Sequence, residues 1–178
     1  MLELEAGLSF IRQSPRDGGE LKLIVRRPAV LLREVVEVGV LDLGEGLVGD
    51  CWRVRGSSRT EDGSAHPDMQ LNIMNARAIE WIAVSQDRWP LAGDQLYVDL
   101  DLSASNLPPG TRLAIGSALI EVTSQPHLGC QKFVQRFGLD AMKFVNSDVG
   151  RSLNLRGINA RVVKLGQITV GDFVTKVS

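Results

Sequence analysis

The stretch "TRLAIGSALIEVTS", residues 111–124, holds two short apolar runs on either side of Gly116. Short runs of branched and leucine side chains separated by glycine are typical of strands joined by a tight turn. The preceding run "GDQLYVDLDL", residues 93–102, has the same character and is separated from it by "NLPPG", residues 106–110. Several short strands divided by Gly and Pro signals favour a barrel or a sandwich.

Working outward, further segments also fit strands. The runs between Leu21 and Val38 are broken by arginines and by Pro28, which marks a turn or an edge. "MQLNIM", residues 69–74, alternates apolar and polar residues, so we expect a half-buried strand. "INARVVKL", residues 158–165, and "ITVGDFVTKV", residues 168–177, are predicted to be the last two strands.

Two helical regions and two loops complete the prediction. Asn75 can cap a helix that runs to about Ser85. A second helical region extends from Phe133 to about Ser152, with a weak point at Gly138. Residues 39–52 are glycine-rich and residues 55–68 are polar, so we expect a loop and a flexible excursion there. The predicted fold class is mainly β, with a few short helices.

Composition limits the classes of function. The chain has 178 residues, enough for one ordinary domain, so residues 1–178 are expected to form a single unit. Lys and Arg total 20 against 21 Asp and Glu, a net charge of −1, which gives no general attraction to nucleic acid or to a membrane. The first residues lack a basic signal region and no apolar run is long enough to span a bilayer. We therefore expect a cytoplasmic protein.

Two cysteines and two histidines are the candidate ligands for a soft metal. Cys51 and Cys130 are expected to be free thiols in a reducing compartment. Their spacing relative to His66 and His127 does not give the close pairs of a structural zinc site. Cys51 follows a glycine-rich turn and precedes Trp52, which indicates a packing role, and His66 is expected in a solvated loop.

Cys130 has different surroundings, in "QPHLGCQKFVQRFG", residues 125–138. Lys132, Arg136 and the start of the helical region would each favour a thiolate. His127 could orient the thiol, act as a base or donate a hydrogen bond, and Gly129 leaves room for a bulky ligand. The alternative is a small buried cysteine beside a surface histidine, but glycine, proline and basic residues are poor core material.

Basic residues are concentrated in the last third of the chain: Lys132, Arg136, Lys143, Arg151 and Arg156. Such a cluster can be a solvated face, yet the arginine fork also suits phosphate and carboxylate. We expect an anion site beside Cys130, with Arg156 placed just before a strand. No phosphate-binding glycine motif, serine-hydrolase motif or metalloprotease motif is present, so nucleotide-dependent and serine-hydrolase functions have no support.

The order of "GLVGD", "MQLNIMN", "AGDQL", "LAIGSALIEVT", "QPHLGCQKF", "RFGLDA", "LRGINARVV" and "VGDFV" resembles the MOSC family, named for the C-terminus of molybdenum-cofactor sulfurases. The resemblance covers about residues 36–174. It implies a β-barrel-like fold and a single reactive cysteine, at Cys130. In the family, that cysteine either ligates the molybdenum of a pterin cofactor or carries sulfur as a persulfide to a metal centre. The family is also linked to pyridoxal-phosphate barrels, but no residue here establishes that cofactor.

The resemblance also implies partners and further site residues. A reductase would supply electrons for reducing an N-oxygenated small molecule, whereas a sulfur carrier would need a sulfur-donor protein. Lys132, Arg136 and Arg156 would hold the cofactor's phosphate. Reductases of the family carry a Gly-Glu-Asn-Leu-like segment, and here Asp94 and Gln95 occupy the matching positions with changed side-chain lengths. A non-catalytic module that binds an anionic cofactor or a partner protein is the remaining alternative.

Overall fold

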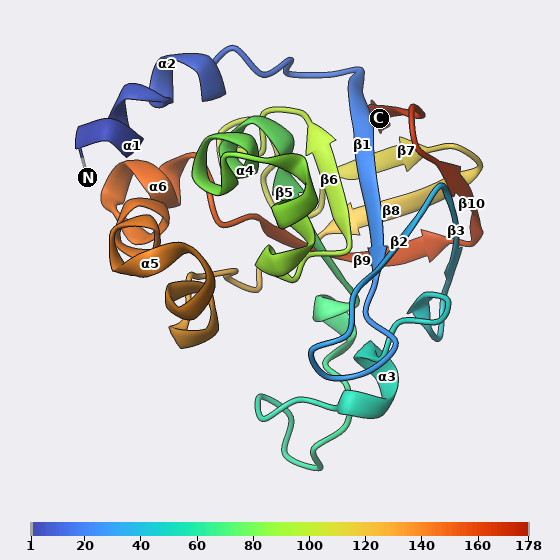
Figure 1. Cartoon of the computed structure of the whole chain (residues 1–178). Coiled ribbons are helices and arrows are strands. Elements are labelled where there is room, and N and C mark those ends of the chain that lie inside the picture. Colours follow the sequence, from blue (N-terminus) through green and yellow to red (C-terminus); the bar gives the residue numbers. More distant parts are fainter. Residues whose placement is uncertain (1, 178) are drawn as a thin grey trace.

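The computed structural model describes residues 2–177, and its main sheet closes into a barrel (Figure 1). In the described part of the chain, seven strands form the ring in the order β11-β7-β8-β9-β5-β6-β1, and β1 pairs back to β11. Their bounds are β1 Gly19–Arg26, β5 Leu71–Asn75, β6 Leu96–Asp99, β7 Arg112–Ile115, β8 Ala118–Val122, β9 Ile158–Lys164 and β11 Phe173–Val177. The predicted β-barrel is confirmed.

Smaller strands lie beside the ring. Strand β2 (Glu34–Val36) pairs with β1, and a separate sheet has the order β10-β3-β4. The bounds of that sheet are β3 Val38–Asp42, β4 Gly46–Leu47 and β10 Gly166–Thr169. The segment 39–52, expected to be a loop, therefore contributes two short strands, and its positive-φ residues are Gly46 and Gly49. The segment 168–177, expected to be one strand, is divided at Gly171, because that residue has φ 95° and the chain turns there into the other sheet.

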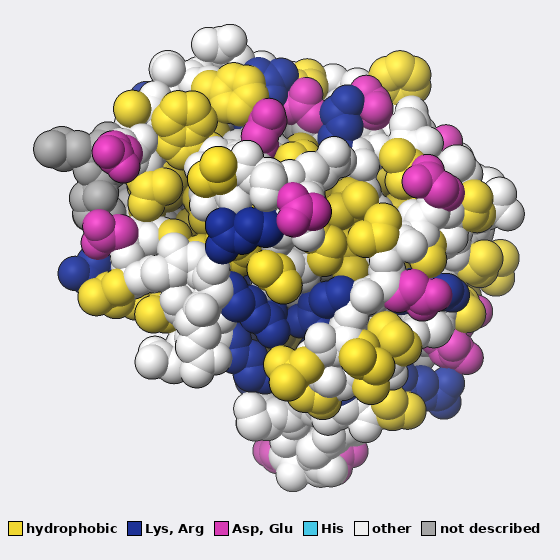
Figure 2. All heavy atoms as spheres, viewed as in Figure 1, with side chains coloured by type: hydrophobic (Ala, Val, Ile, Leu, Met, Phe, Trp, Pro, Cys, Tyr) yellow, Lys and Arg dark blue, Asp and Glu magenta, His cyan; other side chains and the backbone are white. Residues whose placement is uncertain are grey.

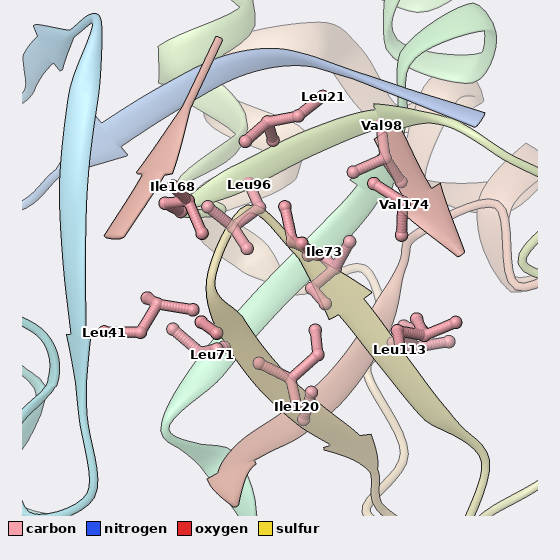
Figure 3. Packing of buried hydrophobic residues seen from close by; sticks show 14 of the residues in the cluster. Leu21, Leu41, Leu71, Ile73, Leu96, Val98, Leu113, Ile120, Ile168 and Val174 are labelled. Carbon is pink, nitrogen blue, oxygen red and sulfur yellow. The ribbon is translucent and has the colours of Figure 1, made fainter. Parts of the chain in front are cut away.

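The barrel interior is filled with aliphatic side chains. Strand β8 alternates as expected, with Ala118, Ile120 and Val122 buried. Side chains from strands far apart in sequence meet there, as Figure 3 shows for Leu21 and Ile73 among others. Such burial of apolar area is the main term that stabilises a domain of this size.

Strand β5 is buried on both faces, which corrects the prediction of a half-buried strand. Leu71 and Ile73 belong to the barrel interior, whereas Met74 belongs to a second core under the helices. The polar side chains Asn72 and Asn75 are also buried and are hydrogen-bonded. The alternation was read correctly, but helices cover the outer face of this strand.

The helices lie mainly on one side of the barrel (Figure 1). The Asn75 side chain accepts a hydrogen bond from the Ala78 amide and caps α4, which ends two residues earlier than expected. Helix α5 is broken at Gly138, where φ is 87° and ψ is 166°. The helical elements are α1 Leu2–Ala6, α2 Leu8–Ile11, α3 Trp52–Arg55, η1 Pro67–Met69, α4 Ala76–Ala83, η2 Gln86–Ala92, α5 Gln131–Asn146 and α6 Asp148–Ser152.

The short helices α1 to α3 were not predicted, while the second helical region was located correctly and begins two residues earlier. Within the segment 55–68, residues 56–66 between α3 and η1 are irregular, as expected of a loop. None of the helices described between residues 2 and 177 has the length and apolarity needed to cross a membrane.

Candidate functional site

A pocket lies between the loop that joins β1 to β2, helix α3 and the start of α5. Its cavity volume is about 180 Å³, and its lining includes Cys130 and His127. Figure 2 shows Lys and Arg side chains gathered in a hollow on this face, with apolar side chains at its margin. The basic side chains that line the pocket are Arg27, Arg33, Arg55, Lys132, Arg136 and Arg156. The lining, drawn from residues 2–177, includes no acidic side chain, so the pocket favours an anion.

Arg27 forms one cationic wall at the end of β1. Its Nε and Nη2 donate to the two carboxylate oxygens of Asp50, each at 2.8 Å, and Nη1 donates to Asn72 Oδ1 at 3.0 Å. The Arg27 side chain is 5% exposed and that of Asp50 is fully buried. A two-point pair with this geometry fixes the guanidinium plane.

Arg156 also lines the pocket and is held by two acceptors of the barrel wall. Its Nη1 donates to Asp94 Oδ2 at 2.7 Å and its Nη2 to the Ala92 carbonyl at 2.9 Å. The guanidinium carbon lies 5.0 Å from the centre of the Phe133 ring, within range of a cation–π contact. Arg156 Nε is buried with no hydrogen-bond partner among the described residues. This leaves one buried donor free beside the cavity.

The positive charges of the other arginines in the lining are less fully balanced by acidic partners. Burial lowers the pKa of Arg33, and the nearby charges of Arg136 and Arg27 lower it further. Burial also lowers the pKa of Arg55, with Arg27 contributing. Arg136 donates to the Leu91 carbonyl rather than to a carboxylate. Mutual repulsion of this kind is relieved when an anion binds.

His127 lies next to Asp94 and lines the pocket as well as two smaller cavities beside it. Its Nδ1 is 3.4 Å from Asp94 Oδ1. Burial moves the pKa of His127 well below 6.5, and the charges of Arg156 and Arg27 act in the same direction. Burial raises the pKa of Asp94, against the opposing effect of Arg156. The imidazole is therefore neutral at neutral pH.

Cys130 is exposed and is the N-cap residue of α5. The loop before it is fixed by Asn146, whose side chain accepts from the Gly129 amide at 2.8 Å and donates to the Gly129 carbonyl at 2.9 Å. The exposed thiol is thus presented at the pocket by a loop that is tied to α5. A buried filler role for Cys130, the alternative left open by the sequence, is wrong.

Some candidates from the sequence lie elsewhere. Gln95 and Asp94 are fully buried behind the pocket wall and do not line it; Gln95 accepts from the Asn72 amide at 2.7 Å. Lys143 does not line the pocket, and Arg151 lines a neighbouring cavity. Cys51 is buried, as its packing role requires, yet it also contributes to the lining.

His66 was expected to be a solvated loop residue; it is half-buried in that loop, and its Nδ1 accepts a hydrogen bond from the Asp68 amide at the start of η1. In residues 2–177 no group of three or more His, Cys, Asp or Glu side chains is arranged to hold a metal.

Sequence reasoning missed half of the cationic lining. Arg27, Arg33 and Arg55 lie far from Cys130 in sequence. The one signal in the sequence is the pair Arg26 and Arg27 at the end of an apolar strand, where a buried arginine requires a partner.

The sequence pattern of a known family, the MOSC domain, matches residues 60–175. The chain belongs to the MOSC domain family. The match covers most of the chain and includes Cys130 and the pocket residues from Asn72 onward. The MOSC domain is linked in general to molybdenum-cofactor-related function. No curated protein sequence matches this chain.

Solved structures agree on the fold of this MOSC domain. YuaD from Bacillus subtilis superposes with a TM-score of 0.64 at 17% identity, covering 88% of this chain and 93% of that one. YiiM from Escherichia coli gives a TM-score of 0.56 at 22% identity, covering 89% and 70%. YiiM from Geobacillus stearothermophilus gives 0.54 at 16% identity, covering 91% and 73%. At such identities the likeness concerns the fold alone.

Proposed function

We propose that the pocket binds an anionic molybdenum-pterin cofactor, with the Cys130 thiolate as a ligand of the metal and the basic lining as the binding site for the pterin phosphate. The single observation that carries this proposal is the exposed thiol at a cavity lined by six basic side chains. With an electron-donating reductase as partner, the protein would reduce an N-oxygenated small molecule.

The residues present fit such a group. Thiolate is a soft ligand and suits a soft metal centre better than carboxylate or carbonyl oxygen does. Arginine forks bind phosphate at two points. The two carboxylates nearest the pocket, Asp50 and Asp94, are paired with Arg27 and Arg156 and are not part of the cavity lining. These two carboxylates therefore orient the arginine side chains and place no acidic group against an anion in the pocket.

Each part of the chain then has a separate role. When bound, the metal centre would supply the two-electron redox chemistry. Arg27 and Arg156 are held rigidly and would orient the anion, whereas Lys132 and Arg136 on α5 add charge beside the thiol. The neutral His127 can exchange a proton with a bound substrate without adding to the charge of the site.

The test is elemental analysis for molybdenum, together with pterin fluorescence, on protein gently purified from a host that makes the cofactor. Near-stoichiometric molybdenum is expected in the wild type and in Cys51→Ser, and its loss in Cys130→Ser. Cys51→Ser is the matched control because it removes the other thiol that lines the same pocket. Wild-type protein that carries neither metal nor pterin from such a host would refute the proposal.

Sulfur transfer is a second candidate, favoured by the exposure of Cys130, since a donor protein must reach the acceptor sulfur directly. The Cys130 thiolate would attack the outer sulfur of a donor persulfide, and the donor would leave as a thiolate. Intact mass should then show one added sulfur that a reductant removes, in Cys51→Ser but not in Cys130→Ser. Equal loading of Cys130→Ser would exclude this role.

Absence of both metal and sulfur would favour the third function, a non-catalytic module for an anionic ligand. Binding would then depend on Arg136 and Arg156 and would be nearly unchanged in Cys130→Ser.

A further inference from the structure

Two buried polar atoms beside the pocket face one another. Asp94 Oδ1 and His127 Nδ1 are 3.4 Å apart, and neither atom has a hydrogen-bond partner among residues 2–177. Asp94 is fully buried, and the side chain of His127 is 14% exposed. A buried polar atom without a partner is costly, so the arrangement that costs least is a proton on one of these two atoms directed at the other.

The position of that proton follows from Arg156. Its guanidinium donates to the other oxygen of Asp94 at 2.7 Å, and its side chain is 7% exposed. A protonated Asp94 would leave this buried cation without a counter-charge, an arrangement that destabilises proteins strongly. The carboxyl group is therefore ionised, and the proton lies on Nδ1 of the imidazole.

A neutral imidazole has one N–H group, so its second nitrogen is an acceptor. Nδ1 is buried beside Asp94 and His127 lines the pocket, so Nε2 is the ring nitrogen that can meet a ligand. The remaining polar side chains of the lining are mostly donors: five arginines and one lysine. The amide oxygen of Asn72 is already used by Arg27. His127 thus places an acceptor among cationic donors.

We propose that this pocket selects oxyanions that carry a proton, such as hydrogen phosphate or the monoanion of a monoester phosphate, over fully deprotonated ones such as sulfate. Nε2 of His127 accepts the O–H of the anion while the arginines bind its other oxygens. Asp94 is a positioning residue, since it touches no ligand and acts by fixing the tautomer of His127 and the orientation of Arg156.

This inference deepens the proposed function by stating the protonation state of the anion, and it is tested without metal or cofactor. Titration calorimetry on the cofactor-free protein compares inorganic phosphate with sulfate, at a pH where phosphate is mainly doubly charged and so matches sulfate in charge. The wild type should bind phosphate about tenfold tighter or more, since one hydrogen bond to a charged group contributes about 1.5–3 kcal/mol.

Asp94→Asn should abolish or invert that preference. The Asn amide can donate to Nδ1, and the ring then carries its proton on Nε2, where it donates to sulfate and repels a protic oxygen. Asp87→Asn is the matched control, because Asp87 is an exposed acid on η2 outside the pocket, and it should retain the wild-type ratio.

Nitrogen-15 NMR of His127 in the wild type, which depends on no variant, should show a protonated Nδ1 and a bare Nε2. Equal affinities for the two anions, no binding of either, or a protonated Nε2 in the wild type would each overturn the inference. A phosphate preference in a protein that never acquires molybdenum would leave this inference standing and refute the proposed function alone.

Discussion

The buried pair of Arg27 and Asp50 allows a quantitative prediction. Asp50 accepts hydrogen bonds from the Arg27 amide at 2.9 Å, from Arg27 Nε and Nη2 at 2.8 Å each, and from the Trp52 amide at 2.9 Å. Replacing Asp50 by Asn retains the shape of the side chain but removes its charge and turns one acceptor into a donor that faces the guanidinium. Because Arg27 is nearly inaccessible to water, we expect the free energy of unfolding to fall by about 3–5 kcal/mol.

The assay is urea denaturation followed by circular dichroism, with equal m-values required for a valid comparison. Glu20→Gln is the matched control, because Glu20 pairs with Lys22 at 2.7 Å on the surface, with side chains 43% and 38% exposed. Its loss should be below about 1 kcal/mol.

Combining Arg27→Met with Asp50→Asn should recover part of the stability lost in the single variant, since the uncompensated cation is then absent. A loss of under about 1 kcal/mol for Asp50→Asn, or a double variant less stable than the sum of the singles, would refute the argument that the pair is coupled by burial.

Three other outcomes are expected. Iodoacetamide should alkylate Cys130 in the native protein at least about a hundredfold faster than Cys51, with both modified in urea, because accessibility governs thiol reactivity; comparable native rates, followed by peptide mass spectrometry, would contradict the exposure of Cys130. The pKa of His127 is lowered in the folded state, so as the pH falls the unfolded chain takes up the imidazole proton before the folded protein does. The free energy of unfolding should therefore fall by up to about 2 kcal/mol between pH 7 and pH 5, relative to His127→Gln. Parallel pH profiles of the two proteins would show that His127 is not buried in its neutral form. Gly138→Ala should lose about 1–3 kcal/mol of unfolding free energy because the backbone there occupies a glycine-only region; a loss no larger than that of the surface change Gly44→Ala would argue against the break in α5.

Local patterns predicted the elements of the fold well where one physical effect dominated. The Gly116 turn gave β7 and β8, and the capping side chain of Asn75 gave the start of α4, since both depend on residues close in sequence. Strand β5 was predicted in place but not in burial, because helices from elsewhere in the chain cover its outer face. The break at Gly171 was missed because Val170 before the Gly-Asp pair and Phe173 after it both favour strands.

The same limit applies to the site: residues close in sequence were predicted, and residues brought in from distant segments were not. Cys130, His127 and Lys132 lie within fourteen consecutive residues, so the sequence alone could predict that they form one site. Arg27, Arg33 and Arg55 reach the pocket only because the β1–β2 loop and α3 fold over the start of α5. No spacing rule relates residue 27 to residue 130, so their proximity follows from the closure of the barrel.

That closure has a consequence for synthesis on the ribosome. Strand β11 pairs with both β1 and β7, so the ring lacks one member until residues 173–177 have emerged. Until then β7 and the Gly19–Glu20 end of β1 keep unpaired backbone edges, which are the usual starting points for association between chains. The nascent protein therefore depends on its final strand to protect its first, and slowing translation ahead of residue 173 should increase its need for chaperones.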